Sequence, residues 1–283
     1  MITAPGSSQA GGLRQSPCWP FARLPLELVC RVFELAANHS PTAYSLCLVS
    51  KEARRWTLPI LYRTVTILSQ AGLETSQVLE VPNAHLVRNL YLSPNVHTIN
   101  LISCAKLQNL ASSAHVLLRA GRFTPEVPTL THLTIHDLPN DGPLMDTLLF
   151  PSLTHLYISN SVALPQHDFW FPAKLSRLTH IVWAGNIVPS VDGLSSFLSP
   201  LELLEKLRVI GLQSQMALDP GRIAASHVEQ QLAAAVRACS FRPKHKIVVM
   251  PRCTLFGSND WNHWFQDSED VWEAAERLLC QHE

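Results

Sequence analysis

Residues 130–135 read Leu-Thr-His-Leu-Thr-Ile, and residues 153–158 read Leu-Thr-His-Leu-Tyr-Ile. In both stretches the first, fourth and sixth positions are apolar. The fourth and sixth positions share one face of a β-strand, because successive side chains of a strand point to opposite sides. The hexad therefore predicts a short strand with one buried face, and its recurrence indicates a repeated structural unit.

Four further copies of this hexad occupy the middle of the chain, at residues 87–92, 107–112, 178–183 and 204–209. In the copy at 107–112 the last apolar position is lost. The fourth positions of the six copies fall at residues 90, 110, 133, 156, 181 and 207, so neighbouring copies are 20 to 26 residues apart. A strand that returns at this interval is typical of leucine-rich repeats.

Residues 85–215 resemble a leucine-rich-repeat solenoid, although the Asn or Cys that normally follows the hexad is missing. Prolines in several connections favour irregular or 3₁₀ segments between the strands. Residues 114–120 and 193–203 instead have helical patterns. An ordinary α/β domain whose strands happen to recur is the alternative interpretation.

The residues beyond the last hexad predict two helices and a strand. Residues 227–239 form an Ala-rich helical pattern, residues 247–250 a buried strand, and residues 267–279 an amphipathic helix. The apolar side of the last helix consists of Val271, Trp272, Ala275, Leu278 and Leu279. A solenoid needs its last apolar edge covered, so we expect residues 216–283 to be a C-terminal helical cap, against which Trp261, Trp264 and Phe265 pack.

A different pattern precedes the repeats, where residues 24–35 read Leu-Pro-Leu-Glu-Leu-Val-Cys-Arg-Val-Phe-Glu-Leu. Placed on a helix, the apolar residues cover about two-thirds of the circumference, more than the single stripe of an ordinary surface helix. Two more short helices are expected, one with Ser40 as its N-cap and Pro41 in its first turn, and one capped by Ser50 and interrupted by Pro59. Three short helices bury little surface, so the excess must pack on the rest of this chain or on a partner.

This N-terminal stretch resembles the F-box in its fungal form. The matching residues are Leu24-Pro25-x-Glu27-Leu28, Val32-Phe33, Leu48-Val49-Ser50-Lys51 and Pro59-x-Leu61-Tyr62-Arg63. The common tryptophan four residues after Val49 is absent, because Ala53 stands there and Trp56 follows three residues later. The resemblance implies a three-helix module that binds a Skp-type adaptor and, through it, the cullin of a ubiquitin ligase. The implied adaptor-binding residues are Leu24, Pro25, Glu27, Leu28, Val32, Phe33, Leu48, Val49 and Lys51.

Composition limits the remaining possibilities. The chain has 283 residues, 47% of them hydrophobic and 16% charged, and a formal net charge of zero. The balance of charge argues against a nucleic-acid partner, and the absence of an apolar run of about 18 residues argues against a membrane span. Seven scattered cysteines without a Cys-x-x-Cys pair indicate reduced thiols. We therefore expect a cytoplasmic or nuclear protein.

The hexads also predict two ladders of side chains on the face opposite the leucines. The first would contain Asn89, Asn109, His132, His155, His180 and Lys206, and the second Tyr91, Ala111, Thr134, Tyr157, Val182 and Arg208. Solenoids bind partners through such surfaces. We therefore expect Tyr91, His132, Thr134, His155, Tyr157, His180 and Arg208 to form a face that binds a target protein. A zinc site on the three histidines is disfavoured, because flat ladders rarely converge to tetrahedral geometry.

No motif for catalysis or phosphate binding is present: the sequence lacks Gly-x-Ser-x-Gly, Gly-x-x-x-x-Gly-Lys-Ser/Thr, Gly-x-Gly-x-x-Gly and His-Glu-x-x-His. We therefore expect neither enzymatic activity nor a cofactor. A hydrolase on an α/β fold is a third possibility, but it would need a nucleophile that no motif locates. The predicted organisation is a disordered tail (1–20), an F-box (21–66), a degenerate repeat solenoid (67–215) and the cap (216–283). The expected function is substrate recognition in a Skp–cullin–F-box ubiquitin ligase, and a non-catalytic interaction scaffold is the alternative.

Overall fold

A computed structural model describes residues 24–37, 39–71, 83–96, 101, 103–121, 127–137, 150–160, 175–185, 190–214, 225–239, 246–250 and 271–281. The chain forms two compact units that divide between Leu61 and Tyr62. Trp261, Trp264 and Phe265, which were expected to pack against the last helix, lie outside the described residues. The same holds for the predicted N-terminal tail.

The first unit contains three helices, α1 (Leu26–Ala37), α2 (Ser40–Cys47) and α3 (Lys51–Leu61). Val29, Phe33 and Ala53 form its small core, with Leu46 and Trp56 packed around them. The predicted cap of α3 is confirmed, because the Ala53 amide donates to Ser50 Oγ over 3.0 Å. Ala53 is fully buried, so the small residue that replaces the usual tryptophan lies where helices meet.

Two expectations about these helices are wrong. Helix α2 already includes Ser40, and His39 is the residue that precedes its first turn, with its Nδ1 atom 3.1 Å from Thr42 Oγ1. Pro59 does not interrupt α3 but lies inside it. A proline there removes one backbone hydrogen bond, and the helix ends two residues later at Leu61.

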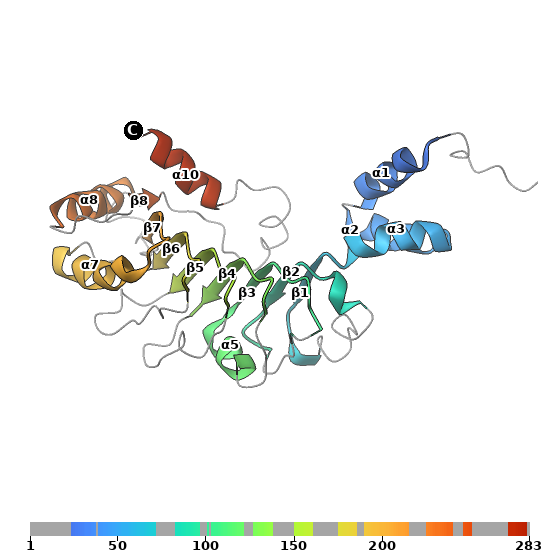
Figure 1. The fold of residues 1–283 in the computed structure, drawn as a ribbon, viewed down its shortest axis with the longest axis horizontal. Coiled ribbons are helices and arrows are strands. Elements are labelled where there is room, and N and C mark those ends of the chain that lie inside the picture. The colour runs from blue at the N-terminus through green and yellow to red at the C-terminus, as the bar shows by residue number, and fades with distance from the viewer. Residues whose placement is uncertain are drawn as a thin grey trace, which may run out of the picture. The chain divides into compact units, whose positions relative to one another are not determined.

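The second unit is built on eight parallel strands whose spatial order is their order in the chain. The strands are β1 (Thr64–Ile67), β2 (Asn89–Leu92), β3 (Asn109–Ser113), β4 (His132–His136), β5 (His155–Asn160), β6 (His180–Gly185), β7 (Val209–Ser214) and β8 (Lys246–Met250). Figure 1 shows this succession as a single row of arrows. The predicted α/β class is confirmed.

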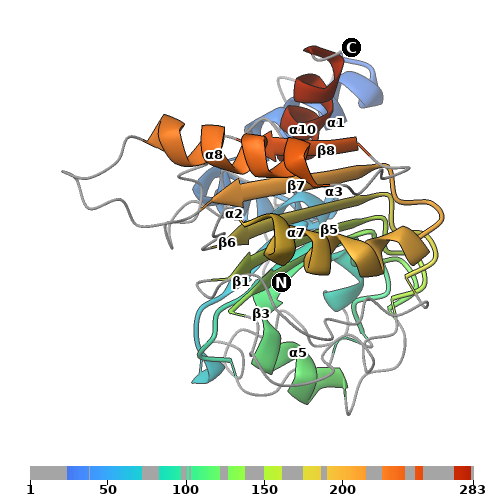
Figure 2. The ribbon, with the colours of Figure 1, turned by 90° about the vertical axis from the view of Figure 1, so that its left-hand side faces the viewer.

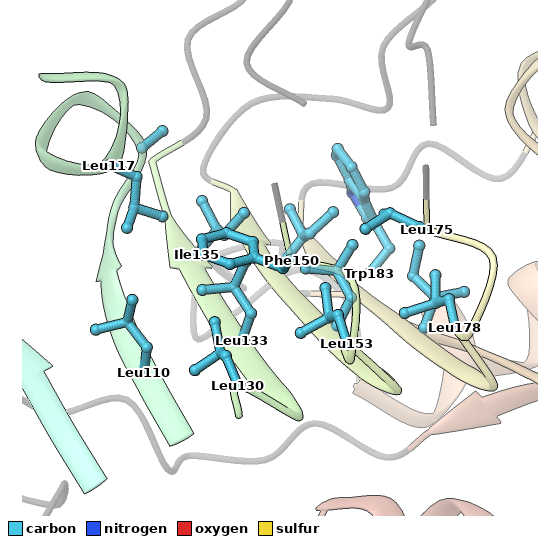
Figure 3. Packing of buried hydrophobic residues seen from close by; sticks show 14 of the residues in the cluster. Leu110, Leu117, Leu130, Leu133, Ile135, Phe150, Leu153, Leu175, Leu178 and Trp183 are labelled. Carbon is cyan, nitrogen blue, oxygen red and sulfur yellow. The ribbon is translucent and has the colours of Figure 1, made fainter. Parts of the chain in front are cut away.

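The leucine face of the sheet carries the main core. Leu110, Leu133 and Leu156 are neighbours across β3, β4 and β5 and are almost fully buried in one cluster. Figure 3 shows Leu110 and Leu133 packed among side chains of the connecting segments, including Leu130, Phe150 and Leu153. The first apolar position of each hexad therefore packs beneath its strand.

Helices cover this face where the sequence predicted them. They are α5 (Ala114–Gly121), α7 (Val191–Leu198), the 3₁₀ segment η2 (Ser199–Leu203) and α8 (Ala225–Ala238), and a further 3₁₀ turn, η1 (Ala84–Leu86), precedes β2. Side chains of α5, α7 and α8 belong to the main core, among them Leu117, Phe197 and Leu232. Figure 2 shows α7 and α8 beside β6, β7 and β8.

Two strands lie outside the six predicted copies of the hexad. Residues 247–250, expected within a terminal cap, belong to β8, which pairs with β7 and extends the same sheet. Strand β1 was not anticipated as part of the repeat, although residues 62–67 read Tyr-Arg-Thr-Val-Thr-Ile and fit the hexad. Val65 and Ile67 of β1 belong to the main core, so the hexad pattern begins one copy earlier than expected.

The last helix, α10 (Val271–Gln281), lies on the opposite face of the sheet. It packs against β7 and β8, and Trp272 and Ala275 share a second cluster with Tyr157, Val182, Ala184, Val209, Val248 and Met250. These strand residues alternate with those of the main core, as side chains on opposite faces must. The helix expected to cap the end of the array therefore covers a face that was expected to be open.

Candidate functional site

The first unit has an unusual apolar surface. Among the described residues, eight of the eleven exposed large apolar side chains belong to this unit: Leu24, Leu26, Leu28, Val32, Leu35, Tyr44, Leu48 and Val49. Leu48 is 72% exposed and Leu28 is 53% exposed. So many exposed apolar side chains on so small a unit are typical of an interaction site.

The surface arises from the spacing of α1. Val29, Phe33 and Ala37 recur at intervals of four residues and face the core of the unit. Leu28, Val32 and Leu35 lie beside them on the helix but are exposed. The excess of apolar residues noted in the sequence is therefore real, since the small core uses one stripe of the helix.

Of the nine residues predicted to bind the adaptor, all except Phe33 are exposed. The ring of Phe33 is 5% exposed and lies edge-on to Trp56, with 5.4 Å between the ring centroids. Phe33 therefore belongs to the core that holds the three helices together and not to the exposed surface. The exposed set contains Leu24, Pro25, Glu27, Leu28, Val32, Leu48, Val49 and Lys51.

On the sheet, the predicted ladders are confirmed from β2 to β6. Asn89, Asn109, His132, His155 and His180 occupy successive rungs, and Tyr91, Ala111, Thr134, Tyr157 and Val182 form the second row. The amide side chains of Asn109 and Asn89 form a chain of hydrogen bonds, from Asn109 Nδ2 to Asn89 Oδ1 (2.7 Å) and from Asn89 Nδ2 to Thr64 Oγ1 (2.9 Å).

The prediction for the last copy of the hexad is wrong. Val209, not Lys206, is paired with His180, and Gly211, not Arg208, is paired with Val182. The correct hexad in this copy begins at Leu207. Arg208 precedes the strand, where its amide donates to Thr179 O over 2.8 Å, so it does not continue the row of Tyr157 and Val182.

The three histidines form a stack, which we call the histidine ladder (His132, His155 and His180). Ring centroids are 4.3 Å apart between His132 and His155 and 4.4 Å apart between His155 and His180, with nearly parallel planes. The preceding threonines orient the rings, because each Nδ1 atom lies 2.8–2.9 Å from the Oγ1 atom of Thr131, Thr154 or Thr179.

The threonine hydroxyls determine which ring nitrogen carries hydrogen. Thr154 Oγ1 donates to Thr131 O (3.1 Å), and Thr179 Oγ1 donates to Thr154 O (3.0 Å). Since each hydroxyl has one hydrogen, its oxygen accepts from the neighbouring Nδ1–H. His155 is thus assigned as the Nδ1–H tautomer, a choice that follows from the hydrogen-bond network.

Helix α10 covers the histidine ladder. Trp272 lies edge-on to His155 with 4.9 Å between the centroids, and its ring is within 6.1–6.5 Å of the other two imidazoles. His180 Nε2 lies 2.8 Å from Glu276 Oε1. His180 Nδ1 lies 2.8 Å from Thr179 Oγ1, so the two nitrogens of this ring face a hydroxyl and a carboxylate.

Burial makes the other two histidines difficult to protonate. Loss of solvent, followed by the charge of His180, lowers the pKa of His132 to about 4. Loss of solvent, followed by the charges of His132 and His180, lowers the pKa of His155 to about 3. At neutral pH, the rings of His132 and His155 are therefore uncharged.

The face expected to bind a target is therefore mostly covered. Tyr91, Thr134, Tyr157 and His180 are buried, and His132 and His155 are half-buried. Tyr157 Oη donates to Gln213 Oε1 over 3.0 Å in a fully buried contact between β5 and β7. The sequence predicted which residues share this face but not that the chain's own helix packs on it.

Two side chains of this site were missed, Trp272 and Glu276. The predicted apolar side of residues 267–279 included Trp272, and Glu276 follows it four residues later, on the same side of a helix. That spacing was the available signal. It did not predict the partner surface, because any apolar face of the chain could have received the helix.

Five cysteines lie in the described part of the chain. Burial raises the pKa of the Cys104 thiol to about 11, which keeps it in the poorly nucleophilic protonated form. The described cysteines, Cys30, Cys47, Cys104, Cys239 and Cys280, are free thiols. Among the described residues, no three His, Cys, Asp or Glu side chains are arranged to hold a metal ion, and no helix is long and apolar enough to span a bilayer.

Comparison with known proteins adds no relative. No family model, no curated protein and no solved structure matches this chain.

Proposed function

We propose that this chain is the substrate-recognition subunit of a Skp–cullin–F-box ubiquitin ligase. The first unit would be an F-box that docks on the Skp-type adaptor, and through it on the cullin. The second unit would be a leucine-rich-repeat-like solenoid that binds a target protein. The chain would then contribute proximity, because it turns transfer of ubiquitin to a separate protein into an effectively intramolecular reaction.

The exposed apolar residues of the first unit carry this proposal. Leu28 and Val32 on α1, and Leu48 and Val49 after α2, belong to the F-box pattern and are exposed. Apolar area removed from water stabilises a complex by roughly 25 cal/mol per Å². Covering this surface would therefore add to the stabilisation that the small core supplies, and Glu27 and Lys51 would supply polar contacts at the rim.

The second unit supports the proposal through its regularity. One strand per repeat, parallel pairing in chain order and an apolar core under the strands are the features by which a solenoid adds copies. Such arrays bind partners through rows of side chains. The two rows from β2 to β6 have this arrangement, although they are mostly covered in this structure.

Co-purification tests the adaptor step. The variant Leu28→Asp with Leu48→Asp places two carboxylates on the exposed apolar surface, and we expect it to lose the adaptor and the cullin together. Leu203→Asp is the matched control, because Leu203 is 77% exposed but lies in the second unit. Circular dichroism of both variants checks that the helices are retained.

Retention of the adaptor by the double variant would overturn the docking proposal. Binding of the adaptor by the wild-type chain without any cullin would instead favour the alternative, a non-catalytic interaction scaffold. The cullin measurement therefore separates the two functions, and the adaptor measurement tests what they share.

A further inference from the structure

Helix α10 shows what the histidine ladder recognises. Trp272 and Glu276 lie four residues apart, on one side of the helix. The indole of Trp272 spans the three imidazoles and is centred on His155, while the Glu276 carboxylate pairs with His180 at the end of the ladder. The aromatic ring of Trp272 thus contacts the imidazoles, and the carboxylate one turn later contacts the end of the ladder.

The surface beneath α10 has an apolar part and a polar part. The apolar part consists of Val182, Val209, Val248 and Met250, which pack with Trp272 and Ala275. The polar part is the histidine ladder, whose imidazoles are each bonded to a threonine hydroxyl. Imidazoles are hydrated readily when uncovered, whereas the apolar part requires a helix over it, either α10 or a helix of a partner.

The described contacts of α10 are separate from the main core. Glu276 is 56% exposed, and ion pairs with so much solvent contribute little. Trp272 and Ala275 are buried, and Leu278 and Leu279 are only partly buried. None of these side chains belongs to the main core cluster. Separation of α10 from the sheet would therefore leave the leucine core intact.

We infer that the histidine ladder is a binding site for an amphipathic helix that presents a tryptophan and, one turn later, a carboxylate. Helix α10 occupies this site as an intramolecular substitute for the corresponding helix of the target protein. The inference rests on the proposed function, because it names the kind of target segment that the second unit binds. The target helix must displace α10, so α10 sets the affinity that the target has to exceed.

Hydrogen exchange on the wild-type chain gives the first test. We expect the amides of α10 to exchange at least on the order of 10-fold faster than those of β4, β5 and β6, through local opening that leaves the sheet folded. Equal protection of α10 and these strands would show that α10 leaves only on global unfolding, and would overturn the inference.

A peptide provides the second test. A fluorescent peptide with the sequence of residues 267–283 is titrated into the full chain carrying Trp272→Ala and Glu276→Gln, which weaken the hold of the chain's own helix. We expect this variant to bind the peptide at least about 10-fold more tightly than the wild-type chain, whose own helix competes at a high effective concentration. The exposed Glu273 offers a matched control, since Glu273→Gln should bind the peptide like the wild type.

Loss of binding on adding His155→Ala to the variant locates the peptide on the ladder. Two outcomes would contradict the inference. One is that the variant does not bind the peptide although its circular dichroism shows an intact sheet, and the other is that the variant and the wild type bind the peptide equally. If the double variant does not fold, Trp272→Phe alone serves, because it shortens the contact with the ladder while an aromatic ring still fills the buried position. Adaptor co-purification is independent of these measurements, so failure here would leave the docking proposal standing.

Discussion

The indole ring of Trp272 lies edge-on to the imidazole ring of His155, with the centroids 4.9 Å apart and the planes inclined by 64°. Edge-to-face contacts of this kind add to the stabilisation from burial alone. The two residues belong to α10 and to the middle of the sheet, 117 positions apart in the sequence (272 minus 155). This contact converts a row of polar residues into part of a second, smaller core.

Acidification should destabilise the second unit. An unfolded histidine has a pKa near 6.5, whereas the pKa of His155 in the folded chain is about 3 and that of His132 about 4. Between these pKa values the unfolded state binds more protons than the folded state. The contribution of the two uncharged histidines to the free energy of unfolding is therefore complete above about pH 6.5 and is lost as the pH falls below it. Urea unfolding at about pH 7.5 and about pH 5 measures the change.

The comparison with His155→Gln tests the cause of this pH dependence. Its stability should change less between the two pH values than that of the wild type, because one titrating group is removed. Glu276 faces the same ladder from α10 and is changed to Gln in a parallel control. An unchanged pH dependence in His155→Gln would contradict the assignment to this residue.

Gly211→Ala should destabilise the sheet between β6 and β7. A Cβ atom at this position would lie 2.7 Å from Val182 Cγ2 and 2.9 Å from Met250 Sδ, so the added methyl group overpacks the second core. Overpacking of this kind costs about 1–3 kcal/mol. Urea denaturation gives the cost, and Val182→Ala introduced together with Gly211→Ala should recover part of it. Full wild-type stability of the single variant would refute the close approach.

Tyr157→Phe should cost about 1 kcal/mol, the usual net contribution of a hydrogen bond. The hydroxyl of Tyr157 donates to Gln213 Oε1 over 3.0 Å, and both side chains are fully buried. Gln213→Leu and the double variant complete a thermodynamic cycle, in which the coupling between the two positions is read from the unfolding free energies. A coupling near zero would show that the bond contributes nothing to stability.

Phe33→Ala and Leu28→Ala should behave differently, although the two residues lie five positions apart on α1. Removing the buried ring of Phe33 should cost about 3–5 kcal/mol, an effect that the small first unit cannot absorb. Removing the exposed side chain of Leu28 should change stability by less than about 0.5 kcal/mol. Amide exchange in α1, α2 and α3 distinguishes the variants, and similar protection in both would contradict the assignment of Phe33 to the core.

The repeats show where sequence reasoning succeeds. Leu133 and Ile135 were expected to share a buried face with Leu156 and Ile158, and they do, because alternate residues of a strand lie on the same face. Sequence reasoning failed at the repeat that contains β7. Before this strand, Leu201, Leu204 and Leu207 follow one another at intervals of three residues, and all three are buried. Two overlapping hexads fit that run, and only strand pairing selected the later one.

The sequence by itself determined the local structure of this protein: the helices of the first unit, the repeated strands, and the identity of the residues in each row. These follow from periodicity, which acts between neighbours in the chain. The tertiary structure decided that Phe33 is internal while Leu28 and Val32 are exposed. It also decided that α10 lies on the histidine ladder instead of closing the end of the array. Both outcomes depend on which apolar surfaces meet, and because burial of apolar area is non-directional, the pattern of one segment does not specify its partner.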